Sequence, residues 1–258
     1  MAEPKTSRRI GLARALSKLG YCSRSQASQL IRAGRVSLNS RTRRDPEQPV
    51  DLTHDRIQVD GHGVLAEKKV YLMLNKPRGI ITTASDEQGR DTIYSLLGAS
   101  LPWLGPVGRL DKASEGLLLL SNDSEWAARI TDPNTHLEKI YHVQINAAAG
   151  ESLLQGLRDG VCDDEDFLRA RRVRVMRSGE RNTWLEIVLD EGKNRQIRRM
   201  LAHFHIDVLR LVRVAIGPLA LGDLARGKVR PLRKNEKAAL DAAIAKPKPA
   251  NLSQGTCS

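Results

Sequence analysis

Apolar residues recur at helical spacing twice within the first 35 residues of the chain. Leucines at intervals of three and four from residue 12 to residue 19 predict a helix, and Gly20 ends it. Ser23 precedes Gln26 by three residues, the spacing of a capping box, which predicts a second helix that Gly34 stops. The chain therefore begins with two short helices in tandem.

Short strands are expected to follow these helices. Residues 36–38 alternate apolar and polar side chains before the turn-forming pair Asn39-Ser40, and residues 57–59 repeat the alternation. Arginines occur throughout this part of the chain, at Arg14, Arg24, Arg32, Arg35, Arg41, Arg43 and Arg44. The pattern predicts a small basic module of two helices and short strands.

From residue 70 onward, apolar runs of strand length alternate with short helical patterns. Strands are expected at 70–74, 79–83, 116–120, 139–145, 167–176, 183–189 and 208–214. Helices are expected at 92–97, 151–158 and 194–204, and another after Asn122 or Asp123, either of which suits its N-cap. Strands with interspersed short helices favour an α+β fold with a mixed, mainly antiparallel sheet.

The change of pattern also predicts the domain boundaries. We expect a small N-terminal domain at 8–66 and a larger domain at 67–244, with residues 67–69 as the linker. Residues 245–258 contain the run KPKP and mostly polar residues, so we expect a disordered tail there.

Charge indicates the class of partner. The 258 residues carry a formal net charge of +12, with a pI near 10.0. Such a balance favours nucleic acid, because each neutralised phosphate releases counterions, whereas the alternative is a merely solvated basic surface. The three cysteines indicate neither a disulfide framework nor a metal site, and no apolar run approaches a membrane span, so we expect a cytoplasmic protein without a membrane partner.

One carboxylate is the leading candidate for chemistry. Asp111 follows Gly108-Arg109-Leu110 and precedes the apolar run 117–120, which is expected to be buried strand. A carboxylate on a loop anchored in the core can act as nucleophile or general base when a nearby charge compensates it; the alternative is a structural aspartate in a turn. The helix expected at 194–204 offers three arginines for compensation, and spacing does not choose among Arg195, Arg198 and Arg199.

Two further segments place polar groups beside predicted strands. In EKIYHV, Tyr141 is either a core aromatic or part of a site. In LNKPRGIITT, Lys76 and Arg78 either contact nucleic-acid phosphates or face water. The histidines show no ligand-like pattern with acids, so no metal is expected.

The N-terminal pattern LARALSKLGYCSRSQASQLIRAGRVSLN, followed by DRIQVDG, resembles the alpha-L RNA-binding domain. In that family the two helices and the adjoining loop present basic side chains to RNA. The resemblance therefore implies RNA contacts at Arg8, Arg9, Arg14, Lys18, Arg24, Arg32 and Arg35.

The segments GRLDKASEGLLLLSND, EKIYHV, EGKNRQIRRML and LNKPRGIITT resemble the signature of RNA pseudouridine synthases, in the branch that carries an N-terminal alpha-L domain and modifies ribosomal RNA. The likeness extends from about residue 12 to residue 232. It implies that Asp111 is the catalytic residue, that Tyr141 stacks on the target base and that Arg198 is the basic partner of the aspartate. It further implies that Arg109 helps to extrude the nucleotide and that Ile197 lines the base pocket.

The resemblance implies isomerisation of uridine to pseudouridine in ribosomal RNA, without cofactor or metal. The NRQIRRM form favours the large subunit. The expected partner of this monomer is ribosomal RNA or a ribosome assembly intermediate. Ser114 and Ser121 stand where many relatives have threonine, which keeps the hydroxyl group. The alternatives are a non-catalytic ribosome-associated RNA-binding protein and an RNA N-glycosylase that stops after bond cleavage.

Overall fold

The computed structural model describes residues 9–83, 90–98 and 101–245. The described residues within Met1–Tyr71, Gly98–Gly105 and Leu120–Ala127 form one compact unit. Those within Leu72–Leu97, Pro106–Leu119 and Ala128–Ser258 form the other.

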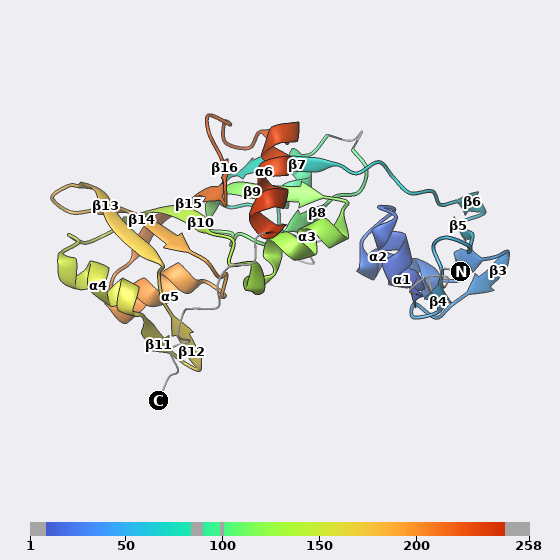
Figure 1. Cartoon of the computed structure of the whole chain (residues 1–258), viewed down its shortest axis with the longest axis horizontal. Coiled ribbons are helices and arrows are strands. Elements are labelled where there is room, and N and C mark those ends of the chain that lie inside the picture. Colours follow the sequence, from blue (N-terminus) through green and yellow to red (C-terminus); the bar gives the residue numbers. More distant parts are fainter. Residues whose placement is uncertain (1–8, 84–89, 99–100, 246–258) are drawn as a thin grey trace, which may run out of the picture. The chain divides into compact units, whose positions relative to one another are not determined.

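The first elements of the chain build a small α/β module (Figure 1). They are β1 (Ile10–Gly11), α1 (Leu12–Lys18), α2 (Arg24–Arg32), β2 (Val36–Leu38), β3 (Arg41–Arg43), β4 (Pro49–Val50), β5 (Ile57–Val59) and β6 (His62–Gly63). The strands form a sheet of order β3-β2-β5-β6 and a separate pair β1-β4. The predicted capping box is confirmed, because the Ser23 hydroxyl accepts from the Gln26 amide and the Gln26 side chain accepts from the Ser23 amide.

The helices and strands after residue 70 build the rest of the fold. The strands are β7 (Tyr71–Lys76), β8 (Gly105–Val107), β9 (Glu115–Ser121), β10 (Lys139–Ile145), β11 (Val161–Asp163), β12 (Asp166–Leu168), β13 (Arg172–Ser178), β14 (Thr183–Leu189), β15 (Val208–Ile216), β16 (Leu219–Ala220) and β17 (Val229–Pro231). The helices are η1 (Ile93–Leu96), α3 (Ser124–Thr131), η2 (Pro133–Thr135), α4 (Glu151–Asp159), α5 (Gln196–His203) and α6 (Lys234–Ala245).

The large sheet is mixed and mainly antiparallel, as the sequence predicts. In the described part of the chain its order is β13-β14-β10-β15-β9-β7-β17, with β16 on β15 and β8 on β9. β15 pairs with β9 in parallel, whereas the pairs β13-β14, β14-β10, β10-β15 and β7-β17 are antiparallel. The fold is therefore α+β.

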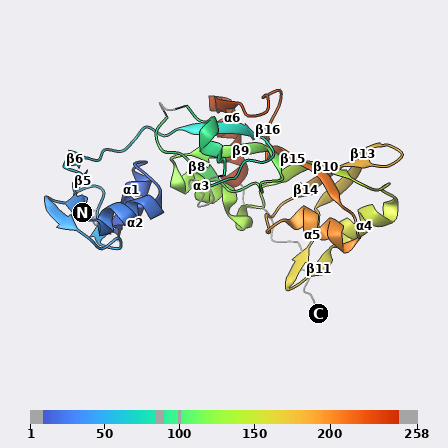
Figure 2. The same ribbon diagram turned by 180° about the vertical axis from the view of Figure 1, so that it is seen from behind.

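The core of the larger unit lies between the sheet and two helices. Residues of β10 and β14 pack with Leu154 and Leu157 of α4 and with Met200 and Leu201 of α5. Both helices lie on the same side of these strands in the two opposite views (Figure 1, Figure 2). The predicted buried run 117–120 is confirmed, since all four leucines are fully buried in β9.

Two expected strands differ from the structure. The strand expected at 79–83 is reduced to an isolated bridge between Ile81 and Thr92, because Gly79 has a φ of +94° and the segment bonds to another loop instead of a ladder. The strand expected at 167–176 is split between β12 and β13. At the break the Ala170 amide donates to the Leu157 carbonyl of α4, which interrupts strand pairing.

Candidate active site

The backbone of Asp111 is fixed, whereas its carboxylate is accessible. The Asp111 carbonyl accepts hydrogen bonds from the Ser114 amide at 3.0 Å and from the Lys76 ammonium at 3.1 Å. The first of these closes a tight turn that leads into β9, where the chain is buried. The Asp111 side chain remains 27% exposed. The turn thus presents a carboxylate to solvent from a rigid base.

Lys76 is the buried residue whose hydrogen bonds hold this turn in place. Its residue exposure is 0%, and its ammonium donates to the carbonyls of Pro77, Asp111 and Ser114 at 3.2, 3.1 and 3.0 Å. Burial lowers the pKa of Lys76 to about 8, against the opposing effects of Asp111 and Glu115. Neither sequence interpretation of Lys76 holds, because the side chain reaches neither water nor an RNA phosphate.

Other residues of the LNKPRGIITT segment form hydrogen bonds with the same loop. The Gly79 amide donates to the Lys112 carbonyl at 2.8 Å, and the Thr82 hydroxyl donates to the Leu110 carbonyl at 2.7 Å. Together with Lys76 these bonds hold the chain immediately before and after Asp111. The segment therefore supports the candidate site through positioning, which its sequence did not reveal.

The structure distinguishes the three candidate arginines, of which Arg195 is the N-cap residue of α5 and Arg198 and Arg199 lie within that helix. Arg195 forms an ion pair with Asp111, with 3.7 Å between Nη1 and Oδ2. Arg199 is engaged elsewhere, bonded to Asp163 and Asp166. Arg199 therefore does not compensate Asp111.

Arg198 ties α5 to the same turn. Its guanidinium donates to the Ala113 and Val208 carbonyls, each at 3.3 Å. Burial lowers the pKa of Arg198, as do the positive charges of Arg195 and Arg78, while Asp111 opposes the shift. Arg198 thus lies in the electrostatic field of Asp111, although the ion pair itself is made by Arg195.

The two expected base-pocket residues belong to one cluster. Ile197 of α5 is 4% exposed and is a member of the core, and Tyr141 of β10 is partly buried against that core. Arg109 is exposed, two residues before Asp111. In the part of the chain that the structure describes, Arg109 has no ion-pairing partner among the salt bridges found. The segments EKIYHV and EGKNRQIRRML therefore meet in this core, and the ion pair of Arg195 with Asp111 joins the second of them to GRLDKASEGLLLLSND.

The expected RNA-binding residues fall into three groups. Arg8 lies outside the described residues. Arg9, Arg14, Arg24 and Arg32 are exposed. Lys18 pairs with Glu125 at 2.7 Å, and Arg35 donates two hydrogen bonds to Asp60. Arg35 is exposed as well, so what sets Arg9, Arg14, Arg24 and Arg32 apart is that they take part in neither of these ion pairs.

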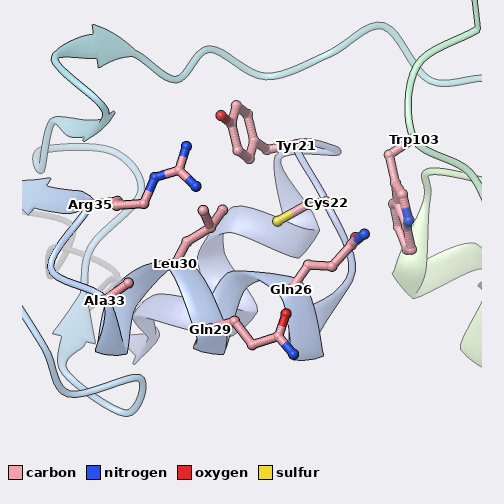
Figure 3. Close-up of a pocket in the computed structure, with 8 residues that line it drawn as sticks. All are labelled: Tyr21, Cys22, Gln26, Gln29, Leu30, Ala33, Arg35 and Trp103. Atoms are coloured by element: carbon pink, nitrogen blue, oxygen red, sulfur yellow. The ribbon is translucent and has the colours of Figure 1, made fainter. Parts of the chain in front are cut away.

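A hollow of about 490 Å³ lies in the smaller unit (Figure 3). Its lining includes Tyr21, Gln26, Leu30 and Arg35, together with Cys22. Burial raises the pKa of the Cys22 thiol to about 11, so this sulfur is protonated at neutral pH and is a poor nucleophile. None of the expected catalytic residues lines this hollow.

The sequence also missed Glu115, a buried carboxylate at the start of β9. Its side chain is 5% exposed and forms ion pairs with Arg210 at 2.9 Å and Arg226 at 3.1 Å. A glutamate two residues before a run of buried leucines is an available signal for such a paired charge. Across the described ranges, no group of three or more His, Cys, Asp or Glu side chains could hold a metal ion, and no helix is long and apolar enough to cross a membrane.

Comparison with known proteins supplies the family. Residues 70–203 match the family model described as RNA pseudouridylate synthase, and residues 10–57 match the S4 domain. A protein of Aquifex aeolicus (strain VF5), named an uncharacterized RNA pseudouridine synthase, is 37% identical over 230 residues, which cover 89% of this chain and 92% of that protein. One of Mycobacterium bovis (strain ATCC BAA-935 / AF2122/97), with the same kind of name, is 38% identical over 249 residues, covering 92% and 96%.

A solved structure shares the architecture. It is described as the crystal structure of pseudouridylate synthase and superposes with a TM-score of 0.64 at 28% sequence identity. The match covers 90% of this chain and 99% of that chain.

Proposed function

The chain belongs to the RNA pseudouridine synthase family, and from this premise we propose that it isomerises a specific uridine of ribosomal RNA, with the large subunit favoured. The chain is an isomerase that carries an S4 domain for binding RNA. We place the domains at 8–66 and 67–244, which the matches at 10–57 and 70–203 support. The proposed setting is the cytoplasm, where a monomer meets ribosomal RNA or an assembly intermediate.

The reaction needs no external reactant. The bond between uracil N1 and ribose C1′ breaks, the uracil turns, and its C5 bonds to C1′, while C5 loses a proton and N1 gains one. Because C1′ is inaccessible inside stacked RNA, the nucleotide must first leave the stack. The proposed assistant in that step is Arg109, whose exposed guanidinium lies beside the catalytic loop.

Asp111 is the proposed catalytic residue. The observation that carries this assignment is its accessible carboxylate on a turn that Lys76 and Ser114 fix, with Arg195 3.7 Å away. Asp111 acts at the ribose, either as nucleophile at C1′ or as the base that removes the proton at C2′. Arg198 is the proposed basic partner, and its guanidinium group, like that of Arg195, places positive charge near the Asp111 carboxylate.

The flipped uracil is proposed to stack on Tyr141, with Ile197 on the other side of the base pocket. Aromatic platforms contribute about 1 to 3 kcal/mol per stacked base. The shared cluster of Tyr141 and Ile197 supports this arrangement, since it brings β10 and α5 to one place.

The ribosomal substrate is tested by mapping pseudouridines in ribosomal RNA from cells with and without this protein. We expect a position in large-subunit RNA to lose the modification and to regain it when the purified chain is added to the unmodified RNA. Loss at a transfer RNA position with unchanged ribosomal RNA would contradict the proposal. An abasic site in the product would indicate a glycosylase instead.

The S4 domain is expected to bind RNA through its exposed helix arginines. Replacing Arg14, Arg24 and Arg32 by glutamine should weaken RNA binding and reduce the slope of log affinity against log salt by about 2 to 3. Filter binding at several salt concentrations measures this slope. Arg41→Gln, which removes an exposed charge from β3 rather than from a helix, is the control, and an equal loss per charge there would contradict a helix-based surface.

A further inference from the structure

The sheet formed by β13, β14, β10 and β15 has an outer face that the proposed mechanism does not use. Val143, Ile145, Leu185 and Ile187 point into the core that contains α4 and α5. Since side chains alternate along a strand, the residues between them point to the opposite face. The helices α4 and α5 cover only the inner side of these strands, as both views show (Figure 1, Figure 2).

Four residues of this outer face form a line across neighbouring strands. Arg177 of β13 lies opposite Trp184 of β14. Gln144 of β10 lies opposite Trp184 on one side and opposite Arg210 of β15 on the other. We call Arg177, Trp184, Gln144 and Arg210 the outer row.

Two guanidinium groups lie against the indole of the outer row. The Cζ atom of Arg177 is 5.4 Å from the centroid of the Trp184 ring, and that of Arg210 is 5.9 Å away. Both distances are within the range of a cation–π interaction. Trp184 is partly exposed and Arg177 is exposed. The outer row therefore contains a solvent-accessible indole ring flanked by positively charged side chains.

The charges of the outer row are not balanced by its neighbours. Arg210 is held by Glu115, but this carboxylate is shared with Arg226, so two guanidinium groups face one negative charge. In the described part of the chain, no salt bridge is found for Arg177. The next line of the sheet is neutral, because Arg174 and Glu186 bond each other at 2.7 and 2.8 Å. The outer row therefore carries excess positive charge around a ring.

We propose that the outer row is a second RNA-binding site, which holds a single-stranded segment on the face of the sheet opposite α4 and α5. A nucleobase stacks on Trp184, while Arg177 and Arg210 contact the adjoining phosphates. The side-chain amide of Gln144, in the same row, offers a hydrogen-bonding group to the RNA. Guanidinium groups around an aromatic ring suit single-stranded RNA, since every base has a π-face and every linkage a negative charge. An apolar protein partner would leave these charges desolvated.

Binding of a fluorescein-labelled polyuridylate to the full chain, followed by anisotropy, tests the site. We expect Trp184→Leu to weaken binding about 5- to 10-fold, because a stacking platform is lost. Arg177→Gln should reduce the salt slope by about 1, because a phosphate contact is lost. Arg174→Gln is the matched control, because it removes an arginine from the same strand whose charge is already paired with Glu186, through hydrogen bonds of 2.7 and 2.8 Å. Equal effects of Arg177→Gln and Arg174→Gln would overturn the proposal.

Intrinsic fluorescence gives a signature that a loss of folding does not imitate. The chain contains Trp103, Trp126 and Trp184, and Trp126 is fully buried. Polyuridylate should quench the wild-type emission, and Trp184→Phe should remove most of that quenching, whereas Trp103→Phe should retain it. Full quenching in Trp184→Phe would overturn stacking at this ring.

The inference uses the RNA-binding activity of the chain and does not need a ribosomal substrate. If mapping finds no ribosomal position that depends on the protein, the proposed substrate is wrong, but these titrations still test whether the outer row binds RNA. If the titrations show no effect of Trp184 or Arg177, the outer row fails and the mapping is unaffected.

Discussion

Asp111→Asn is expected to lower the rate of pseudouridine formation by about 10⁴-fold or more, while RNA affinity stays within a few-fold of wild type. Asparagine has nearly the same shape but is neither a nucleophile nor a base, so it can neither attack C1′ nor remove the C2′ proton. Affinity should be retained, because the arginines proposed to contact RNA are unchanged and a carboxylate does not attract phosphate. Release of tritium from uracil C5 under single-turnover conditions measures the rate.

The matched control for this variant is Asp223→Asn, since Asp223 is an exposed aspartate outside the motif segments. It should retain the wild-type rate. Normal turnover by Asp111→Asn would refute the catalytic assignment. A comparable loss in Asp223→Asn would attribute the effect to general perturbation of the protein.

Lys76→Met is expected to lower the free energy of unfolding by about 2 to 4 kcal/mol, because buried carbonyls lose their donor. The Pro77 and Ser114 carbonyls lose the ammonium, and the Asp111 carbonyl keeps its bond to the Ser114 amide. Urea unfolding followed by circular dichroism measures the change. Lys112→Met makes the same substitution at an exposed position of the same loop and should be nearly neutral.

The same variant separates positioning from folding. At a temperature where Lys76→Met is fully folded, we expect kcat to fall by about 10²-fold with a much smaller change in KM, because a loosened turn misplaces the Asp111 carboxylate. An unchanged kcat in the folded variant would show that Lys76 serves stability alone.

The stability contributed by Lys76 should depend on pH with a defined sign. Burial lowers its pKa to about 8 from the ordinary 10.5, so the unfolded chain binds more protons between these values. The stability of the wild type relative to Lys76→Met should therefore rise as pH increases from 8 to 10.5. A constant difference across this window would contradict the burial of a charged lysine.

Structural features that depend on residues close together in the chain could be predicted from the sequence. The capping box of Ser23 and Gln26, the fully buried strand β9 and the limits of β10 and β14 follow from spacing along a few residues. The N-cap of α3 was open between two residues, and the structure selects Asp123, whose carboxylate accepts from the Trp126 amide at 3.1 Å. The helix α6 was missed.

The sequence by itself determined the α+β class, the basic character, the motif segments and the candidate role of Asp111. The tertiary structure alone decided that Lys76 is buried against the turn that carries Asp111, that Arg195 makes the ion pair with Asp111 while Arg199 is engaged elsewhere, and that the outer row lines up across four strands. The physical reason is the distance along the chain over which each interaction acts. Helix spacing, capping and strand alternation act over a few residues, whereas burial of a charge and the choice of its partner depend on segments that meet only after the chain has folded.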